Sequence, residues 1–167
     1  MTKSSHQRSA FEAMFRKYHP ALVRYAFVHV KSMEDARECT QEVFINIWEK
    51  RDKLEFNDDL RYYLYRATKN TCLNFLTKRR LDTVSLDEAI TASSIQEKED
   101  GRDKERLKSV MAQIDALPSV CREIFMMSRI EGLTHKEIAE ILEIAPKTVE
   151  NQVGIALKKI RQGVRSE

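Results

Sequence analysis

The segment from Thr134 to Arg161 constrains the fold of this chain more than any other part of the sequence. Thr134 and Glu137 have the spacing of a capping box, in which each side chain satisfies a backbone N–H of the first helical turn. Apolar residues follow at helical spacing, a turn is predicted at 143–145, and Pro146 suits the first position of a second helix. This pattern predicts a helix-turn-helix, an arrangement that places a helix in the major groove of DNA.

The second predicted helix has two unlike faces when its residues are placed about 100° apart around the helix axis. The predicted core face comprises Val149, Val153, Ala156, Leu157 and Ile160. The opposite face comprises Lys147, Asn151, Gly154, Lys158 and Arg161, with Glu150 and Ile155 at its edges. Asparagine can pair with adenine, glutamate can accept a hydrogen bond from cytosine, and lysine suits phosphates. A solvated amphipathic helix is the alternative, but the capping box, the short turn and the basic face together favour DNA binding.

Gly154 lies inside this predicted helix, where glycine costs about 1 kcal/mol relative to alanine. A close approach of DNA would explain the glycine, and so would a packing contact within the protein. The sequence leaves both explanations open.

The first half of the chain predicts three helices, at about 10–31, 32–51 and 59–80, because apolar residues recur in each at helical spacing. Residues that end helices are scarce, with only 4 Gly and 3 Pro in 167 residues, which favours long helices. Pro20 is expected to break or kink the first helix. Ser32 is expected to cap the second, which has acidic residues in its first turn.

The third of these helices is predicted to be both basic and aromatic. Between Arg61 and Arg80 the sequence has six basic residues and no acidic one. Tyr62, Arg66 and Lys69 share one face, and rings beside cations suit a single-stranded nucleic acid. The alternative is that the tyrosines belong to the core and the cations are solvated, and the spacing does not decide between the two.

Residues 81–103 differ in composition from the segments on either side. They contain seven acidic residues, two basic residues and no aromatic residue, which predicts a flexible acidic linker. Helices are predicted again from Lys104, and Gly132 is expected to end the helix that precedes the helix-turn-helix. The first of these helices has an apolar stripe of Leu107, Val110, Met111, Ile114 and Leu117. The predicted fold is therefore all-α, with two small helical domains at 8–80 and 104–163.

Residue types that the sequence lacks argue against several function classes. The three cysteines and four histidines have no metal-ligand spacing, and three distant cysteines do not suggest a disulfide framework, so we expect buried thiols in a reducing compartment. The sequence has no Gly-rich phosphate loop and no nucleophile–base arrangement, so an enzyme is not predicted. With no membrane-length apolar run and no signal peptide, a cytoplasmic protein is expected.

Three stretches, in this order, carry a resemblance to one family: DARECTQEVFINIWEK, LRYYLYRATKNTCLNFLTKRR and LTHKEIAEILEIAPKTVENQVGIALKKIR. With the acidic linker before the third stretch, the chain from about Phe11 to Arg161 resembles the extracytoplasmic-function (ECF) subfamily of the sigma-70 family of RNA polymerase sigma factors. The resemblance implies a factor that binds core RNA polymerase, recognises −35 and −10 promoter elements and helps to open the DNA. It implies no cofactor.

The resemblance also implies roles for individual residues. Core polymerase binding falls on Glu38, Gln41 and Glu42. Recognition and melting of the −10 element fall on Phe56, Asn57, Asp58, Arg61, Tyr62, Tyr63, Arg66 and Asn70. Recognition of the −35 element falls on Lys147, Thr148, Glu150, Asn151, Gly154, Ile155 and Lys158. Some relatives carry arginine or a large aromatic residue where this chain has Glu150, Gly154 and Ile155, so their −35 sequence cannot be carried over.

The partners that the resemblance implies are core RNA polymerase, through its β′ clamp coiled coil and β flap, and promoter DNA. The DNA would be double-stranded at −35 and single-stranded at −10, and an anti-sigma factor is a further implied partner. The alternative function is a conventional DNA-binding regulator that uses only the C-terminal helix-turn-helix. Such a regulator would bind duplex DNA tightly by itself as a dimer on a palindrome, and the sequence has no obvious dimerisation seam.

Overall fold

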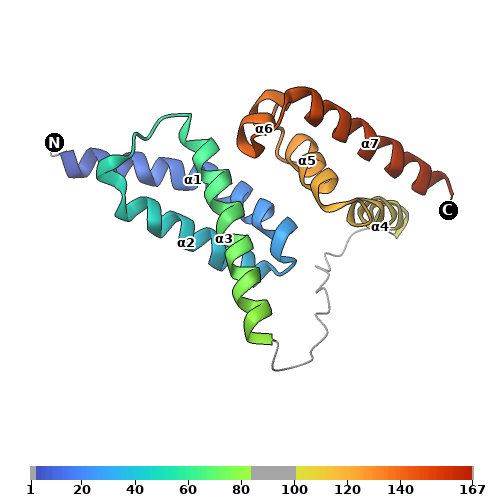
Figure 1. Ribbon diagram of the computed structural model, residues 1–167, viewed down its shortest axis with the longest axis horizontal. Helices are drawn as coiled ribbons and strands as arrows, with labels where there is room; N and C mark the ends of the chain where they lie inside the picture. Colours follow the sequence, from blue (N-terminus) through green and yellow to red (C-terminus); the bar gives the residue numbers. More distant parts are fainter. Residues whose placement is uncertain (1–2, 84–100, 167) are drawn as a thin grey trace. The chain divides into compact units, whose positions relative to one another are not determined.

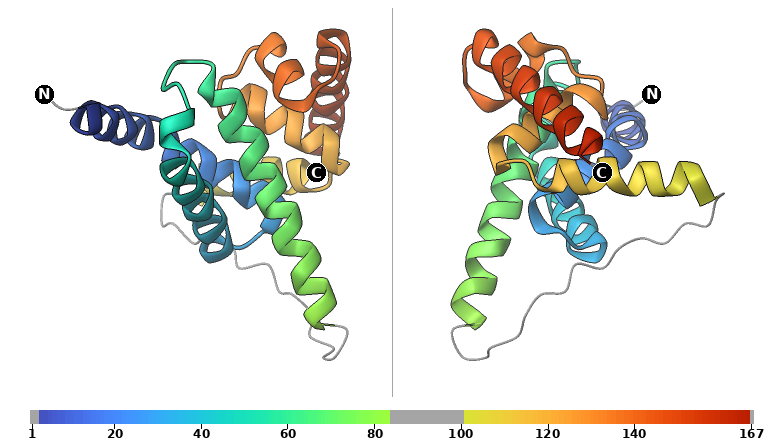
Figure 2. Two further views of the ribbon diagram at one scale, coloured as in Figure 1. Left: turned by 60° about the vertical axis from the view of Figure 1, so that its left-hand side comes forward. Right: turned by 90° about the vertical axis from the view of Figure 1, so that its right-hand side faces the viewer.

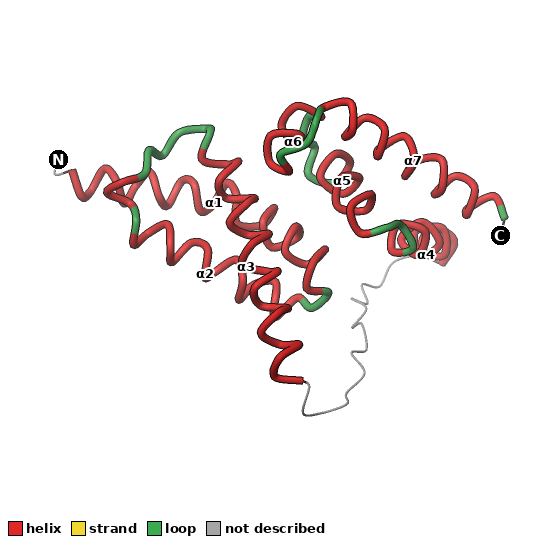
Figure 3. Tube along the Cα trace, in the orientation of Figure 1, coloured by secondary structure: helices red, strands yellow, loops and turns green. Residues whose placement is uncertain are grey.

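The computed structural model describes residues 3–83 and 101–166, and every regular element within these ranges is a helix (Figure 1, Figure 3). The chain divides into two compact units, 1–93 and 94–167. The first unit contains α1 (Lys3–Val30), α2 (Met33–Glu49), the short 3-10 helix η1 (Arg51–Lys53) and α3 (Leu60–Thr83). The second unit contains α4 (Gly101–Asp115), α5 (Ser119–Arg129), α6 (His135–Leu142) and α7 (Pro146–Arg165). The predicted all-α fold is confirmed.

α1 is one continuous helix from Lys3 to Val30. Of the two effects expected of Pro20, a break does not occur, and a kink stays a prediction. A proline inside a helix removes one backbone hydrogen bond and clashes with the preceding turn. In this unit α1 packs against both α2 and α3, and Leu22 and Tyr25, just after the proline, are almost completely buried. Burial of apolar surface on both sides of Pro20 offsets its local cost.

α2 forms as its sequence predicts. The hydroxyl oxygen of its N-cap, Ser32, accepts a hydrogen bond from the backbone N–H of Asp35 at 3.3 Å. The buried face comprises Ala36, Cys39, Thr40, Val43, Phe44 and Ile47. Thr40 is the polar member of this face, and its hydroxyl donates to the carbonyl oxygen of Ala36 at 2.8 Å. Its burial therefore leaves the hydroxyl with a partner.

Helical spacing predicts one apolar stripe on α3, comprising Leu60, Leu64, Ala67, Thr71 and Phe75, but the structure buries a different set. Its buried residues are Leu60, Leu64, Tyr65, Thr68 and Cys72. By contrast, Ala67, Thr71 and Phe75 are only half-buried. Tyr65 packs edge-on against Tyr25 of α1, with the ring centroids 5.1 Å apart, so the core interpretation is correct for this tyrosine. The stripe is displaced because α3 contacts both α1 and α2, and a helix covered on two sides buries more than one periodic row.

The last turns of α3 project beyond the other helices of its unit (Figure 2). Residues 77–83 are exposed, and Arg79 is joined to Asp35 of α2 by an ion pair of 2.8 Å. α3 continues past its predicted end to Thr83, and α4 begins at Gly101, so both ends of the predicted linker are helical. The remainder of that linker, 84–100, lies outside the described residues.

The second unit is assembled around α7, which contacts α4, α5 and α6. One cluster of buried side chains joins three of these helices and comprises Ile114, Leu117, Cys121, Phe125, Ala156 and Ile160. After α5, Gly132 has φ 69°, the left-handed conformation that glycine adopts without strain. The prediction that Gly132 marks the end of this helix is confirmed.

α4 is covered less completely than its apolar stripe predicts. Ile114 is 5% exposed, whereas Leu107 is 62% exposed and Met111 is 43% exposed. The N-terminal turns of α4 project away from α5 and α7 (Figure 2). Periodicity therefore predicted a helix correctly but overestimated how much of that helix is buried.

The three cysteines are free and buried, as the sequence predicts. Cys39 and Cys72 belong to one cluster of buried side chains in the first unit, and Cys121 belongs to the cluster in the second. Burial raises the pKa of all three thiols. They are therefore protonated at neutral pH, and a protonated thiol is a poor nucleophile.

We expect the native protein to react very slowly with an aromatic disulfide reagent at neutral pH, because burial suppresses both access and ionisation of the thiols. All three cysteines should react after unfolding in guanidinium chloride. The absorbance of the released thiolate measures both reactions, with the unfolded protein as the control. Rapid reaction of one thiol in native buffer would contradict the burial of that cysteine.

Candidate nucleic-acid and polymerase interfaces

The helix-turn-helix of the second unit forms as predicted. The Thr134 backbone N–H donates to the Glu137 carboxylate at 2.9 Å, and the Glu137 N–H donates to the Thr134 hydroxyl at 3.2 Å, which completes the capping box. Pro146 occupies the start of α7. In the turn, Glu143 has φ 56°, a left-handed conformation that costs a non-glycine residue about 1–2 kcal/mol. Buried Ala139 lies on the inner side of α6, where a small side chain lets the two helices cross closely.

α7 presents the two faces that its sequence predicts. The buried face comprises Val149, Val153, Ala156 and Ile160, and Leu157 is half-buried beside them. The residues implied for −35 recognition are all exposed: Lys147, Thr148, Glu150, Asn151, Gly154, Ile155 and Lys158. We call this set the α7 strip. It begins at the N-terminal turn of the helix, which is the part of a recognition helix that reaches base edges in the major groove.

Two members of the α7 strip are paired with each other. The Lys147 ammonium donates to the Glu150 carboxylate at 2.9 Å, and this hydrogen bond lowers the pKa of Glu150. The carboxylate is therefore ionised at neutral pH and acts only as an acceptor. Because the pair is exposed, it can separate readily when another partner approaches.

Gly154 has no packing role among the described residues. A Cβ added at this position would have no neighbouring atom of those residues within 4 Å, so they do not provide the packing contact that the sequence left open. Gly163 on the same helix is different, because a Cβ there would collide with the side chain of Gln113 on α4. Gly154 therefore leaves a gap on the outer surface of α7.

The loop at 54–59 carries the first residues implied for the −10 element. Phe56 is half-buried and packs edge-on against Phe11 of α1, with ring centroids 6.4 Å apart. The side-chain oxygen of Asn57 accepts a hydrogen bond from the backbone N–H of Asp59 at 3.1 Å, and its amide donates to the Glu55 carboxylate at 3.4 Å. Asn57 is exposed. The loop is therefore anchored at its phenylalanine and accessible at its asparagine.

The other residues implied for the −10 element lie along the first turns of α3. Arg61 donates to the Tyr62 hydroxyl at 3.2 Å, and its guanidinium lies 5.0 Å from the centre of that ring. Tyr63 is 39% exposed, Asn70 is exposed, and Arg66 is half-buried. Cations beside accessible ring faces meet the physical requirements of a single-stranded nucleic-acid surface.

A contribution from α1 to this region was not predicted from the sequence. Lys17 forms an ion pair of 3.3 Å with Asp58, and Lys17 and Tyr18 line a hollow of about 450 Å³ beside the loop. The paired residues are 41 positions apart in the sequence. No local spacing could indicate such a contact, which arises only when the loop folds over α1.

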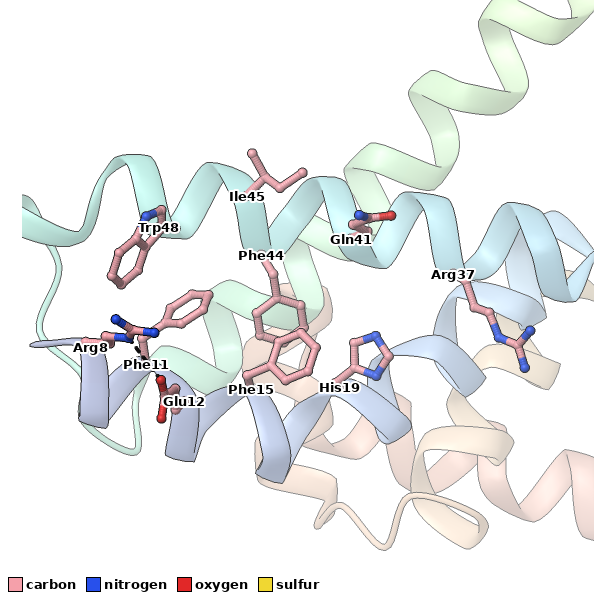
Figure 4. Close-up of a pocket in the computed structure, with 10 residues that line it drawn as sticks. All are labelled: Arg8, Phe11, Glu12, Phe15, His19, Arg37, Gln41, Phe44, Ile45 and Trp48. Atoms are coloured by element: carbon pink, nitrogen blue, oxygen red, sulfur yellow. Dashed lines mark hydrogen bonds and ion pairs between the residues drawn. The ribbon is translucent and has the colours of Figure 1, made fainter.

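The residues implied for polymerase binding lie on the outer face of α2. Glu38, Gln41 and Glu42 are exposed, on the side of the helix away from its buried stripe. Beside Gln41, a groove of about 620 Å³ runs between α1 and α2 (Figure 4). Phe15 and Ile45, which line it, are 38% and 51% exposed. An exposed apolar groove with a polar border suits contact with another protein.

Aromatic rings form the floor of this groove (Figure 4). The ring centroids of Phe15 and Phe44 are 4.8 Å apart, and those of Phe11 and Trp48 are 5.0 Å apart. His19 stacks on Phe15 at 4.6 Å, and burial lowers the pKa of His19, so its imidazole is largely neutral at neutral pH. Phe15 is 38% exposed although its ring packs against Phe44 of α2.

Comparison with known proteins identifies both units. Residues 14–81 match the family described as Sigma-70 region 2, and residues 107–160 match the family described as Sigma-70, region 4. Each match falls within one compact unit of the structure. Two sigma-70 regions in this order define a DNA-binding factor of transcription initiation.

Relatives match over most of their length. The ferric citrate uptake sigma factor FecI of Escherichia coli is 27% identical over 153 residues, which cover 89% of this chain and 87% of that protein. The ECF RNA polymerase sigma-E factor of Escherichia coli is 25% identical over 169 residues, which cover 95% of this chain and 88% of that protein.

Solved structures share the fold. The sigma factor RpoE of Bartonella quintana, in complex with the anti-sigma factor NepR, has a TM-score of 0.74 at 20% identity and covers 93% of this chain and 96% of its own. CnrH, in complex with the cytosolic domain of CnrY, has a TM-score of 0.68 at 20% identity and covers 96% of this chain and 90% of its own.

The chain belongs to the extracytoplasmic-function subfamily of the sigma-70 family of RNA polymerase sigma factors. It binds core RNA polymerase and promoter DNA and directs promoter-specific initiation of transcription. Within 3–83 and 101–166, no helix is both long and apolar enough to cross a membrane. The same residues contain no group of three or more His, Cys, Asp or Glu that could hold a metal ion.

We expect Gly154→Ala to raise the free energy of unfolding by about 0.5–1 kcal/mol, because alanine favours the helix and its methyl group meets no other protein atom. Chemical denaturation measures the change. Gly163→Ala is the contrasting variant, since its methyl group must displace Gln113, and a smaller gain is expected. A loss of stability in Gly154→Ala would show that the protein itself uses the gap.

Proposed function

We propose that the α7 strip reads the −35 element, and that the loop at 54–59 together with the first turns of α3 reads and melts the −10 element. The observation that carries this proposal is Gly154. An exposed glycine in a helix interior costs stability, and no described atom of the protein fills the gap that it leaves. A gap of this kind is useful where an external surface must approach the helix closely, and the major groove of DNA is such a surface.

At the −35 element, each member of the α7 strip has a contact that suits its chemistry. Asn151 can donate to and accept from an adenine edge, and Glu150 can accept from the amino group of cytosine. Ile155 can contact a thymine methyl group, and Thr148 can hydrogen-bond to a base or a phosphate. Lys147 and Lys158 suit phosphates, which fix the register of the helix without reading sequence.

At the −10 element, the first unit would stabilise bases that have left the duplex. Extruding one base costs a few kcal/mol, and contacts that exist only with the extruded base offset this cost. Asn57 and Asp58 offer hydrogen-bonding groups to the edge of that base, and Phe56 holds their loop in place. Along α3, the rings of Tyr62 and Tyr63 offer stacking surfaces, Arg61 and Arg66 offer cations to phosphates, and Asn70 offers an amide.

The outer face of α2 is the proposed site of polymerase attachment. Glu38, Gln41 and Glu42 form its polar part, and the groove beside Gln41 offers an apolar surface that includes Phe15 and Ile45. A groove bordered by polar groups suits an amphipathic helix, and the β′ clamp coiled coil of RNA polymerase has that form. The β flap is the proposed partner of the second unit.

Further parts of the proposal rest on likeness to relatives. Because the solved sigma factor RpoE is in complex with the anti-sigma factor NepR, and CnrH is in complex with the cytosolic domain of CnrY, we extend an anti-sigma partner to this chain as well. We also propose that the protein acts in the cytoplasm, where RNA polymerase works. Promoter opening needs no covalent step, so the protein is proposed to act without enzymatic activity of its own.

Transcription from a genomic promoter library tests the proposed function directly. Purified core RNA polymerase is assayed with and without the full chain, and new transcripts are mapped at their starts. We expect new start sites that share paired −35 and −10 motifs. The absence of new starts, combined with tight duplex binding by the protein alone, would favour a conventional regulator that uses only the helix-turn-helix.

Replacement of Asn151 and replacement of Lys158 by alanine should change promoter binding in different ways. Asn151→Ala should lose discrimination at one −35 position, at a cost of about 1–3 kcal/mol on the preferred promoter. Lys158→Ala should weaken all promoters similarly and flatten the dependence of binding on salt. Holoenzyme binding to promoters with single −35 changes, at several salt concentrations, measures both effects. Equal weakening of every promoter by Asn151→Ala would remove Asn151 from the base-reading residues.

Gly154→Ala should weaken −35 binding even though it stabilises the free protein. These opposite signs distinguish a surface shaped for DNA from one shaped by folding, because a folding defect would lower stability and binding together. The same holoenzyme assay measures binding, and chemical denaturation of the same sample measures stability. Unchanged −35 binding in this variant would show that DNA does not enter the gap.

Gln41→Ala with Glu42→Ala should impair assembly with core polymerase, because both side chains lie on the proposed contact face. The fold should remain intact, since neither residue is buried. Asn74→Ala with Asp82→Ala removes one amide and one carboxylate from exposed positions of α3 and is the matched control. Analytical size-exclusion chromatography with core polymerase measures assembly, and normal assembly of the first pair would contradict the assignment of α2.

A further inference from the structure

The loop at 54–59 carries exposed carboxylates that repel single-stranded DNA. Asn57 is exposed, and the carboxylates of Glu55, Asp58 and Asp59 lie close to it in the sequence and are exposed as well. A DNA strand carries a negative charge at every phosphate, and carboxylates at short range repel it. A nucleotide can approach Asn57 more easily if a cation compensates this acidic loop.

Lys17 of α1 supplies a cation at this place. Its ammonium lies 3.3 Å from the carboxylate of Asp58 and 5.1 Å from the centre of the Tyr18 ring. All three residues line the hollow beside the loop, and Asn57 borders the same hollow. Hydrogen bonds to Tyr18 and, with a smaller effect, to Asp58 raise the pKa of Lys17. The Lys17 side chain is therefore charged at neutral pH.

We propose that Lys17 is a positioning residue of the −10 site, which neutralises Asp58 and thereby admits an extruded nucleotide to the hollow beside Asn57. This inference rests on the proposed assignment of the loop to the −10 element and adds α1 to that site. Lys17 acts through Asp58 and need not touch the base.

A role in folding alone fits the geometry less well. The side chains of Lys17 and Asp58 are 62% and 85% exposed, and ion pairs this accessible to water add little to folding stability. The loop also has an apolar anchor, because Phe56 packs against Phe11. The effect of the ion pair is therefore expected on the charge of the loop and not on the stability of the unit.

The experiment measures open-complex formation by holoenzyme assembled from core RNA polymerase and the full chain. The template is a promoter found in the transcription screen, together with variants changed at each −10 position. Lys17→Gln should lower the association constant by about threefold, and the effect should shrink at high salt. Lys17→Arg keeps the positive charge and should have the same association constant as the wild type. Arg16→Gln is the matched control, because Arg16 is the exposed neighbour of Lys17 and carries the same charge.

Repeating Lys17→Gln in an Asp58→Asn background separates the possible roles of Lys17. If Lys17 acts through Asp58, Lys17→Gln has no further effect in that background, whatever Asp58→Asn does by itself. A loss of the same size in both backgrounds would overturn the proposal, because Lys17 would then act independently of Asp58. A fall in the unfolding midpoint of Lys17→Gln that accounts for its loss of binding would also overturn it.

The wild-type protein distinguishes failure of this proposal from failure of the function on which it rests. Open-complex formation by the wild type that does not depend on the −10 bases would overturn the assignment of the loop, and the role of Lys17 with it. A base-dependent wild type together with an unaffected Lys17→Gln would overturn the role of Lys17 alone.

Discussion

Burial of the apolar residues of each helix, inside a small helical unit, is the constraint on which the functional surfaces depend. On α7, burial of Val149 and Val153 leaves Asn151 and Gly154 exposed to water. On α2, burial of its inner residues likewise leaves Gln41 on the outside. Core formation therefore determines which surfaces are exposed. Once the apolar row of a helix is buried, the helical period decides which side chains are available to a partner.

Charge is arranged on these surfaces in short, exposed pairs of opposite sign. Lys147 pairs with Glu150 on α7, and Lys17 pairs with Asp58 beside the loop. In both places an acidic group that can accept a hydrogen bond lies on a surface that we propose to contact DNA. A neighbouring lysine reduces the repulsion without committing the site to one partner, because water-exposed ion pairs are weak and exchange easily. The acids can thus contribute to selectivity while the surface remains compatible with DNA.

Local chemistry explains which parts of the fold could be predicted from the sequence. Three local features depend on residues within a few positions of one another: the capping box at Thr134, the N-cap at Ser32 and the left-handed conformation of Gly132. Their patterns can therefore be recognised in the sequence alone. The predicted faces of α7 were confirmed for a related reason, since that helix is buried along a single row. Long-range contacts decided other points: α1 continues through Pro20, and α3 buries Tyr65, which the sequence had left open.

The sequence by itself determined the helical class, the helix-turn-helix and the set of residues that α7 exposes, because helix periodicity and capping are properties of neighbouring residues. Tertiary structure alone decided which tyrosines of α3 are available, that Phe15 and Ile45 border an open groove, and that Lys17 of α1 reaches Asp58. The last contact joins residues 41 positions apart. Its existence depends on how the loop crosses α1, and that crossing is settled by the combined burial of three helices and not by any local pattern.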